Sequence, residues 1–274
     1  MLSEEIIKGL KELHFLSFGD SHEYIEFFFK NWVSEPNCFY TLEDGKVIGA
    51  LYYRDFTVSL FGEVKKIPFF NAIATHPNYR HRGVARELID RAVNECGKRG
   101  YPFVMLHPFS ADFYKNLNFV PISFCEEVNI TYKPLKDISE KPITNADIPA
   151  LKALYNNEAK RYPCHKLRSE TEFKLWVEQL MLNPDFGYLI CENGIPKGYY
   201  FIEGERITEF IGSDINLLFA SKKADGKTLR KLSENGKVYS MARGCENLEK
   251  ITACNPNCFT NDYKTLNIFM YETY

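Results

Sequence analysis

The segment from Phe69 to Cys96 constrains the fold of this chain most, because it joins a strand, a tight turn and a helix. Residues 69–74 form an apolar run without charged side chains, as is typical of a buried strand. From Val84 the apolar residues recur at helical spacing, and the pattern ends before Gly97. The segment therefore predicts a strand followed by a helix, with residues 80–85 in the turn between them.

The turn at residues 80–85 (RHRGVA) has the composition of an anion-binding loop. The first turn of a helix has unpaired N–H groups and a partial positive charge, so it attracts phosphate groups. Gly83 allows the backbone to approach such a ligand closely, and the two arginines add fork-shaped hydrogen-bond donors. An ordinary strand-to-helix turn with surface arginines is the alternative interpretation.

The surrounding chain predicts a small antiparallel sheet with helices packed on it. The strand expected at 101–106 would lie parallel to the strand at 69–74, because a helix connects the two, and a ligand would bind at their carboxyl ends. Apolar faces and turn residues predict the remaining elements. These are helices at 3–16 and 22–33 and strands at 38–42, 47–59 and about 120–131.

A second motif follows the strand at 101–106. Residues 113–119 are Phe-Tyr-Lys-Asn-Leu-Asn-Phe, and a short helix is expected to include Tyr114. Asn118 suits a turn with φ above zero, because asparagine adopts this conformation more readily than most residues.

Together these two motifs resemble the GNAT superfamily of acyl-CoA N-acyltransferases. The turn at 80–85 follows that family's Arg/Gln-x-x-Gly-x-Gly/Ala pattern, and residues 113–119 follow Phe-Tyr-x-x-x-Gly-Phe with Asn118 in place of the glycine. The resemblance implies that the turn holds the pyrophosphate of acetyl-CoA and that the preceding strand binds its pantetheine arm. The residues expected to bind acetyl-CoA are Ile73, Ala74, Thr75, Arg80, His81, Arg82, Gly83, Val84, Ala85 and Ser110.

The same resemblance implies a catalytic role for Tyr114, beside the sulfur of the thioester. A tyrosine with a pKa near 10 is protonated at pH 7 and can donate a proton to the leaving thiolate. A structural tyrosine whose hydroxyl caps a backbone group is the alternative. His107 and Ser110 form a conceivable nucleophile pair, but no Gly-x-Ser-x-Gly turn surrounds the serine, so we do not predict one.

The second half of the chain repeats the pattern of the first without its anion-binding turn. Residues 133–142 contain two prolines and mixed charges, and we interpret them as a linker. Two helices and a hairpin are then expected, and the segments 42–53 and 191–202 correspond as a degenerate internal repeat. We therefore predict a catalytic domain at 1–135 and a degenerate GNAT-like domain at 136–274.

Two tandem halves of this kind resemble the Eis-like (enhanced intracellular survival) branch of the superfamily. The implied fold is mixed α/β: a twisted, mostly antiparallel sheet with a central parallel pair flanked by helices, then a second GNAT-like half. In that branch the terminal carboxylate enters the active site as the base, which here would be that of Tyr274. An α-carboxylate is a weak base unless burial raises its pKa, so a frayed terminal tyrosine is the alternative.

Composition argues against several other classes of protein. A net charge of −2 gives no broad basic field for nucleic acid. No apolar run approaches the roughly 18 residues that span a bilayer, and we recognise no secretory signal, so a cytoplasmic protein without a membrane partner is expected. The eight cysteines are scattered, as expected of reduced thiols, and lack the spacing of a metal site.

We therefore expect an N-acetyltransferase that moves an acetyl group from acetyl-CoA to an amine of a small molecule or peptide, without a metal. The resemblance also allows a homo-oligomer. Two alternatives stay open: a CoA-binding regulatory module without turnover, and a transferase of a larger acyl or aminoacyl group.

Overall fold

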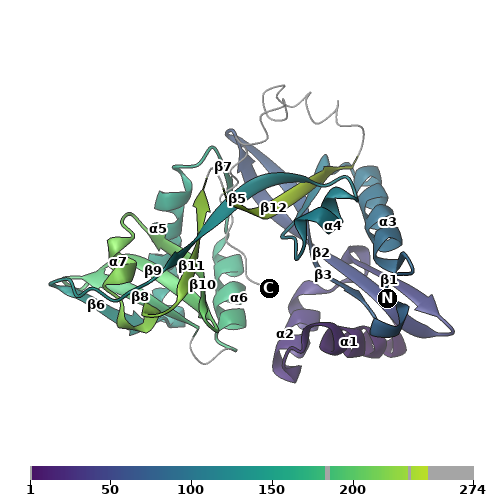
Figure 1. The fold of residues 1–274 in the computed structure, drawn as a ribbon, viewed down its shortest axis with the longest axis horizontal. Helices are drawn as coiled ribbons and strands as arrows, with labels where there is room; N and C mark the ends of the chain where they lie inside the picture. The colour runs from purple at the N-terminus through teal and green to yellow at the C-terminus, as the bar shows by residue number, and fades with distance from the viewer. Residues whose placement is uncertain (1, 183–185, 234–235, 246–274) are drawn as a thin grey trace.

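The strands of the described chain form one continuous sheet with helices on both faces (Figure 1). The computed structural model describes residues 2–182, 186–233 and 236–245. In the described residues the strand order is β1-β2-β3-β4-β12-β5-β11-β10-β9-β8-β6, and β7 pairs with β2. The strands are β1 (Cys38–Glu43), β2 (Lys46–Leu60), β3 (Glu63–Thr75), β4 (Phe103–Leu106), β5 (Val120–Asn129), β6 (Ile138–Pro142), β7 (Cys164–Lys166), β8 (Gly187–Glu192), β9 (Ile195–Glu203), β10 (Arg206–Gly212), β11 (Thr228–Ser233) and β12 (Lys237–Gly244).

Helices cover the sheet in two lobes. We call β1–β4 and β12 with their helices the first lobe, and β6 and β8–β11 with theirs the second lobe, and β5 belongs to both. The helices of the first lobe are α1 (Glu4–Phe18), α2 (His22–Trp32), α3 (Val84–Lys98) and α4 (Ala111–Lys115). Those of the second lobe are α5 (Ile148–Ala159), α6 (Glu170–Leu180) and the short α7 (Asn216–Phe219).

Serine caps define the starts of the first two helices. The backbone N–H of Ile6 donates to Ser3 Oγ at 3.3 Å, and that of Tyr24 donates to Ser21 Oγ at 3.2 Å. Each bond satisfies a donor that the first helical turn leaves unpaired.

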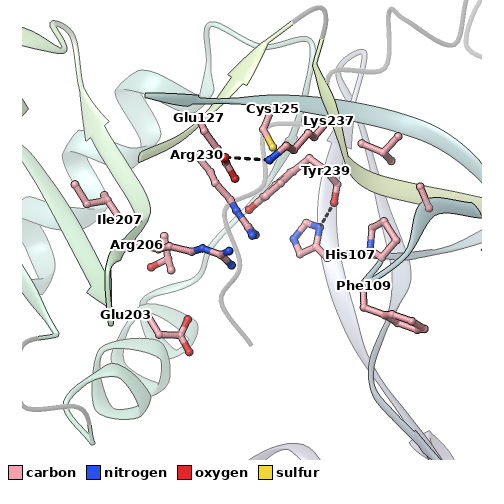
Figure 2. Close-up of a pocket in the computed structure, with 14 residues that line it drawn as sticks. His107, Phe109, Cys125, Glu127, Glu203, Arg206, Ile207, Arg230, Lys237 and Tyr239 are labelled. Atoms are coloured by element: carbon pink, nitrogen blue, oxygen red, sulfur yellow. Dashed lines mark hydrogen bonds and ion pairs between the residues drawn. The ribbon is translucent and has the colours of Figure 1, made fainter. Parts of the chain in front are cut away.

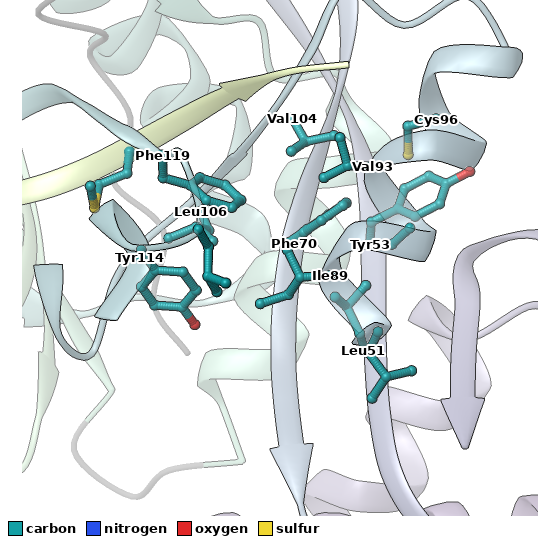
Figure 3. Packing of buried hydrophobic residues seen from close by; sticks show 14 of the residues in the cluster. Leu51, Tyr53, Phe70, Ile89, Val93, Cys96, Val104, Leu106, Tyr114 and Phe119 are labelled. Atoms are coloured by element: carbon teal, nitrogen blue, oxygen red, sulfur yellow. The ribbon is translucent and has the colours of Figure 1, made fainter. Parts of the chain in front are cut away.

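The first lobe is a three-layer structure. Along β2, Leu51 and Tyr53 pack against α3, whereas Ala50 and Tyr52 pack against α1 and α2 on the opposite face. Figure 3 shows the α3 side, where Phe70 packs among Leu51, Ile89, Val93 and Val104. The core thereby fixes α3, and with it the turn that precedes the helix.

Two parallel strand pairs confirm the predicted mixed sheet. In the first lobe β3 and β4 run parallel, with Phe69 opposite Met105 and Phe70 opposite Leu106. In the second lobe β10 and β11 run parallel, with Arg206 opposite Thr228. The first pair ends at Phe70 because β4 ends at Leu106, which lies opposite it.

A strand from the second half of the sequence completes the first lobe. β12 inserts between β4 and β5 and is antiparallel to both, and the buried hydroxyls of Ser123 and Ser240 are hydrogen-bonded at 2.8 Å. β5 continues past this point to pair with β11, so β5 and β12 connect the lobes (Figure 1). The domain boundary near residue 135 stays a prediction, and the sheet runs on across it.

Three strands were not predicted: β11, which lies inside the sheet, and β6 and β7. Residues 138–142 form β6, which pairs with β8, so the interpretation of 133–142 as a linker is wrong for this part. β7 pairs with the far end of β2, and its neighbour Leu167 donates its backbone N–H to Thr57 O at 2.7 Å. β6 and β7 satisfy backbone groups at sheet edges, which local composition does not specify.

The second lobe repeats two helices and an antiparallel hairpin but not the long helix. Between β10 and β11 lie only short helical elements in the described chain, the four-residue α7 and a 3-10 helix at Lys222–Ala224. Buried Arg168 forms a bidentate pair with Glu209, at 3.0 and 2.8 Å, and stacks 4.3 Å from the Trp176 ring. Across the described residues, no helix has the length and apolar character to cross a membrane.

Candidate active site

The end of β3 contains a bulge. In the pairing of β2 with β3, Tyr52 of β2 lies opposite Asn71, and Ala50 of β2 lies opposite Ala74. Two residues of β3, Ala72 and Ile73, therefore lie opposite a single residue of β2. Ala72 adopts φ +43°, which costs a non-glycine residue of the order of 1–3 kcal/mol unless packing holds it. A bulge removes backbone groups from the ladder and turns them toward a neighbouring site.

The turn before α3 is open to an anion. Gly83 is the N-cap of α3 with φ +85°, and a Cβ placed there would meet nothing within 4 Å. Among the residues that the structure describes, no side chain caps the first turn of α3. Arg80 donates its Nε–H to Thr75 O at 3.4 Å, which connects the turn to the end of β3. The N–H groups of this helical turn are therefore available to a ligand.

Tyr114 lies in α4 and is 3% exposed. Its ring packs edge-on against Phe119, with 5.6 Å between ring centroids. Burial raises the pKa of Tyr114 well above its ordinary value near 10, so the hydroxyl is protonated at neutral pH. Asn118 has φ +62°, as predicted for the residue at the family's glycine position.

The cleft between these elements measures about 730 Å³, within the range of roughly 300–1,000 Å³ that is usual for ligand pockets. Nine of the predicted residues line it: Ile73, Ala74, Thr75, Arg80, His81, Gly83, Val84, Ala85 and Tyr114. The structure thus brings the bulged strand end, the open helix N-terminus and the buried tyrosine together around one space.

Two predicted residues do not line the cleft. Arg82 stacks its guanidinium at 5.0 Å on the ring of Tyr79, and Tyr79 does line the cleft. Ser110 caps α4, where its Oγ accepts the backbone N–H of Phe113 at 3.4 Å. Tyr274 lies outside the described residues.

Other residues of the cleft were not predicted from the sequence. Ser17 and Phe18, at the end of α1, form part of its wall. Arg86 donates to Asn116 O at 3.3 Å, which connects α3 to the end of α4 across the cleft. No local pattern identifies such residues, because only the packing of distant helices brings them there.

A second cavity of about 550 Å³ lies where the lobes meet (Figure 2). His107 enters it from the end of β4, and its Nδ1 lies 2.9 Å from Tyr239 O. Because a carbonyl oxygen can only accept, Nδ1 of this bond carries the proton, and Nε2 is the acceptor nitrogen of the neutral ring. Phe109 lines this cavity and the cleft, so the two spaces are neighbours.

Within the described residues, no group of three or more His, Cys, Asp or Glu side chains is arranged to hold a metal ion.

Residues 1–122 match the family model described as an acetyltransferase (GNAT) domain. This match covers 122 of the 274 residues. It spans β1–β4 and α1–α4, and so includes the whole set of residues around the cleft. The match bears out the predicted resemblance to the GNAT family and supports a transferase. No curated protein matches the sequence significantly.

Solved structures of GNAT proteins resemble this chain over most of its length. A GCN5-related N-acetyltransferase from Anabaena variabilis superposes with a TM-score of 0.66 and 18% identity, covering 89% of this chain and 71% of its own. A GCN5-related N-acetyltransferase from Kribbella flavida gives 0.59 and 14%, covering 88% and 69%. Eis1 from Mycobacterium abscessus gives 0.65 and 12%, covering 92% and 74%. At these identities the similarity shows the fold alone, and it confirms the predicted GNAT architecture beyond the first lobe.

Proposed function

We propose that the chain is an acyl-CoA-dependent N-acetyltransferase that moves an acetyl group from acetyl-CoA to an amine of a small molecule or peptide. The observation that supports this most is the 730 Å³ cleft, which the bulged end of β3, the open N-terminus of α3 and Tyr114 share. Each of these elements suits a different part of the donor.

The binding step uses the backbone. The first-turn N–H groups of α3, with Arg80 beside them, suit the pyrophosphate. The backbone groups of Ile73 to Thr75 suit the amide groups of the pantetheine arm. The arm would pair with them as an extra strand pairs with a sheet edge. Gly83 leaves the approach to the helix open.

The chemical step requires stabilisation of two developing charges. The neutral amine attacks the thioester carbonyl, and a backbone N–H at the Ala72 bulge donates to the oxygen as it becomes negative. The attacking nitrogen then loses a proton to water and the C–S bond breaks. CoA leaves as a thiolate, whose sulfur accepts a hydrogen bond from the Tyr114 hydroxyl. A thiol has a pKa near 8.5, below that of buried Tyr114, so we assign the tyrosine a hydrogen bond rather than complete proton transfer.

Two further roles stay predictions. A terminal carboxylate at Tyr274 would act on the attacking amine, and the second lobe would form one wall of the acceptor site. We propose two domains, at 1–135 and 136–274. We further propose a cytoplasmic location, and the resemblance to the Eis-like branch allows a homo-oligomer.

Calorimetric titration with acetyl-CoA tests the donor site, with wild type compared to Gly83→Glu. A carboxylate about 4 Å from a phosphate charge costs about 4 kcal/mol at an effective dielectric constant of 20, so we expect affinity to fall about a thousandfold. Gly100→Glu is the matched control, because Gly100 has φ +84° and equally open surroundings at the other end of α3.

Binding lost in Gly83→Glu and kept in Gly100→Glu supports the donor site. Absent binding in the wild type, or equal loss in both variants, contradicts it. Acetyl-CoA binding without CoA release in the presence of any amine would favour the regulatory alternative.

A further inference from the structure

We infer that the acceptor amine carries a carboxylate or phosphate group, and that Arg206 and Arg230 bind this group in the cavity between the lobes. The inference rests on the proposed function for the transfer step. It concerns a different cavity from the donor cleft and a different set of residues.

The sheet register places the two arginines on one face. Arg206 begins β10 and stands opposite Thr228 of the parallel strand β11. Side chains two residues apart on a strand point to the same side, so Arg230 shares the face of Thr228 and therefore of Arg206. Figure 2 shows both guanidinium groups directed toward the middle of the cavity.

The cavity has positive charge in excess. Lys237 donates to Glu127 Oε2 at 3.0 Å, so these two charges neutralise each other (Figure 2). Glu203 is the other carboxylate of the lining, against two arginines. Among the described residues, neither Arg206 nor Arg230 forms a hydrogen bond through its guanidinium or an ion pair, and the charges of Glu127 and Glu203 act on both arginines only at longer range. Both groups are therefore available to a ligand with negative oxygens, which guanidinium binds in bidentate geometry.

Apolar side chains lie beside the arginines in this cavity, so a bound anion would be less hydrated there than on an open surface. Ile207, Val238 and Phe109 line the cavity together with the charged groups. An anion that enters it loses part of its hydration, and its attraction to the arginines is stronger there than in bulk water.

The cavity adjoins the place where the acetyl group would be transferred. Phe109 lines both spaces, and its ring centroid lies 5.6 Å from that of Tyr114. An amine whose anionic end lies between the arginines can therefore extend past Phe109 toward the thioester. This arrangement suits an amino acid, a short peptide or a phosphorylated amine rather than a polycation.

Matched acceptor pairs test the inference, with CoA release as the readout. Tyrosine is compared with tyramine for the carboxylate, and phosphoethanolamine with ethanolamine for the phosphate. In at least one pair we expect the anionic member to have a kcat/KM at least about tenfold higher, as a charge-assisted hydrogen bond would give. The pair with the larger ratio identifies the anion. Equal or higher kcat/KM for the members that lack the anionic group overturns the inference.

Arginine variants locate the effect. In Arg206→Met and Arg230→Met we expect the KM for the acceptor with the anionic group to rise about 10- to 100-fold. The value of kcat, and the KM for the partner that lacks this group, should stay unchanged. Arg161→Met is the control, because Arg161 is paired with Glu158 on the surface at 3.0 Å. Unchanged KM values in both arginine variants overturn the assignment.

A binding experiment separates this inference from the proposed function. Inorganic phosphate is titrated into the wild type and into Arg230→Met at low salt, without acetyl-CoA. Phosphate binding that disappears in the variant supports the anion site even if no amine is acetylated. No phosphate binding by the wild type overturns the site, whatever the acetyl-CoA titration shows.

Discussion

Replacement of Tyr114 by phenylalanine isolates the hydroxyl from the ring. The ring is 3% exposed and packs in the first-lobe core with Leu106, Leu117 and Phe119. Phenylalanine keeps these contacts, so the variant is expected to fold and to keep the shape of the cleft. Any change in turnover then reports on the hydroxyl alone.

The expected loss follows from the strength of one hydrogen bond. A bond to a charged acceptor contributes about 1.5–3 kcal/mol, and each 1.36 kcal/mol of barrier changes the rate tenfold. We therefore expect Tyr114→Phe to lower kcat about 10- to 150-fold. The affinity for acetyl-CoA should stay nearly unchanged, because the sulfur acquires negative charge only as the C–S bond breaks.

Steady-state CoA release and calorimetric titration measure the two quantities separately, and a pH profile adds an independent readout. The donor is the protonated form of Tyr114, and burial raises the pKa of this group above its usual value near 10. Its deprotonation is thus shifted to higher pH, so wild-type kcat should not decline between neutrality and about pH 10 through loss of this proton.

Tyr155→Phe is the matched control, since its buried hydroxyl donates to Lys166 O at 2.9 Å in the second lobe. It should lower the free energy of unfolding by about 0.5–1.5 kcal/mol and leave kcat unchanged. Equal losses of kcat and acetyl-CoA affinity in Tyr114→Phe would refute the assigned role, as would unchanged kcat.

Two further predictions concern packing. In Gly49→Ala the new Cβ would lie 2.6 Å from Val84 Cγ1, so the start of α3 must shift. We expect the free energy of unfolding to fall by about 1–3 kcal/mol and the acetyl-CoA affinity, measured by titration, to fall as well. Unchanged affinity would mean that the start of α3 does not position the donor. Arg168→Met leaves Glu209 as an uncompensated buried charge, which costs about 3–5 kcal/mol and should lower the Tm by roughly 6–20 °C. Arg161→Met, on the surface, should change the Tm little, and a similar small change in Arg168→Met would contradict the argument.

The local features of the donor cleft could be predicted from the sequence, because each depends on residues close together in the chain. The turn before α3 requires φ above zero, which Gly83 adopts without strain, and Asn118 meets the same requirement near Tyr114. Apolar periodicity likewise predicts α3 and its parallel strand neighbours. The match over residues 1–122 agrees with these local signals.

Only the tertiary structure determined what lies between the lobes. Backbone hydrogen bonds are alike in every strand. No local sequence pattern therefore predicts that β12, rather than another strand, lies between β4 and β5. The same holds for Arg206 and Arg230, which look like ordinary strand residues until parallel pairing places them on one face. The sequence by itself thus determined the strand, turn and helix around Gly83 through φ requirements and side-chain periodicity. The cavity between the lobes depends on strand pairing between distant segments, and the packing of the whole chain determines this pairing.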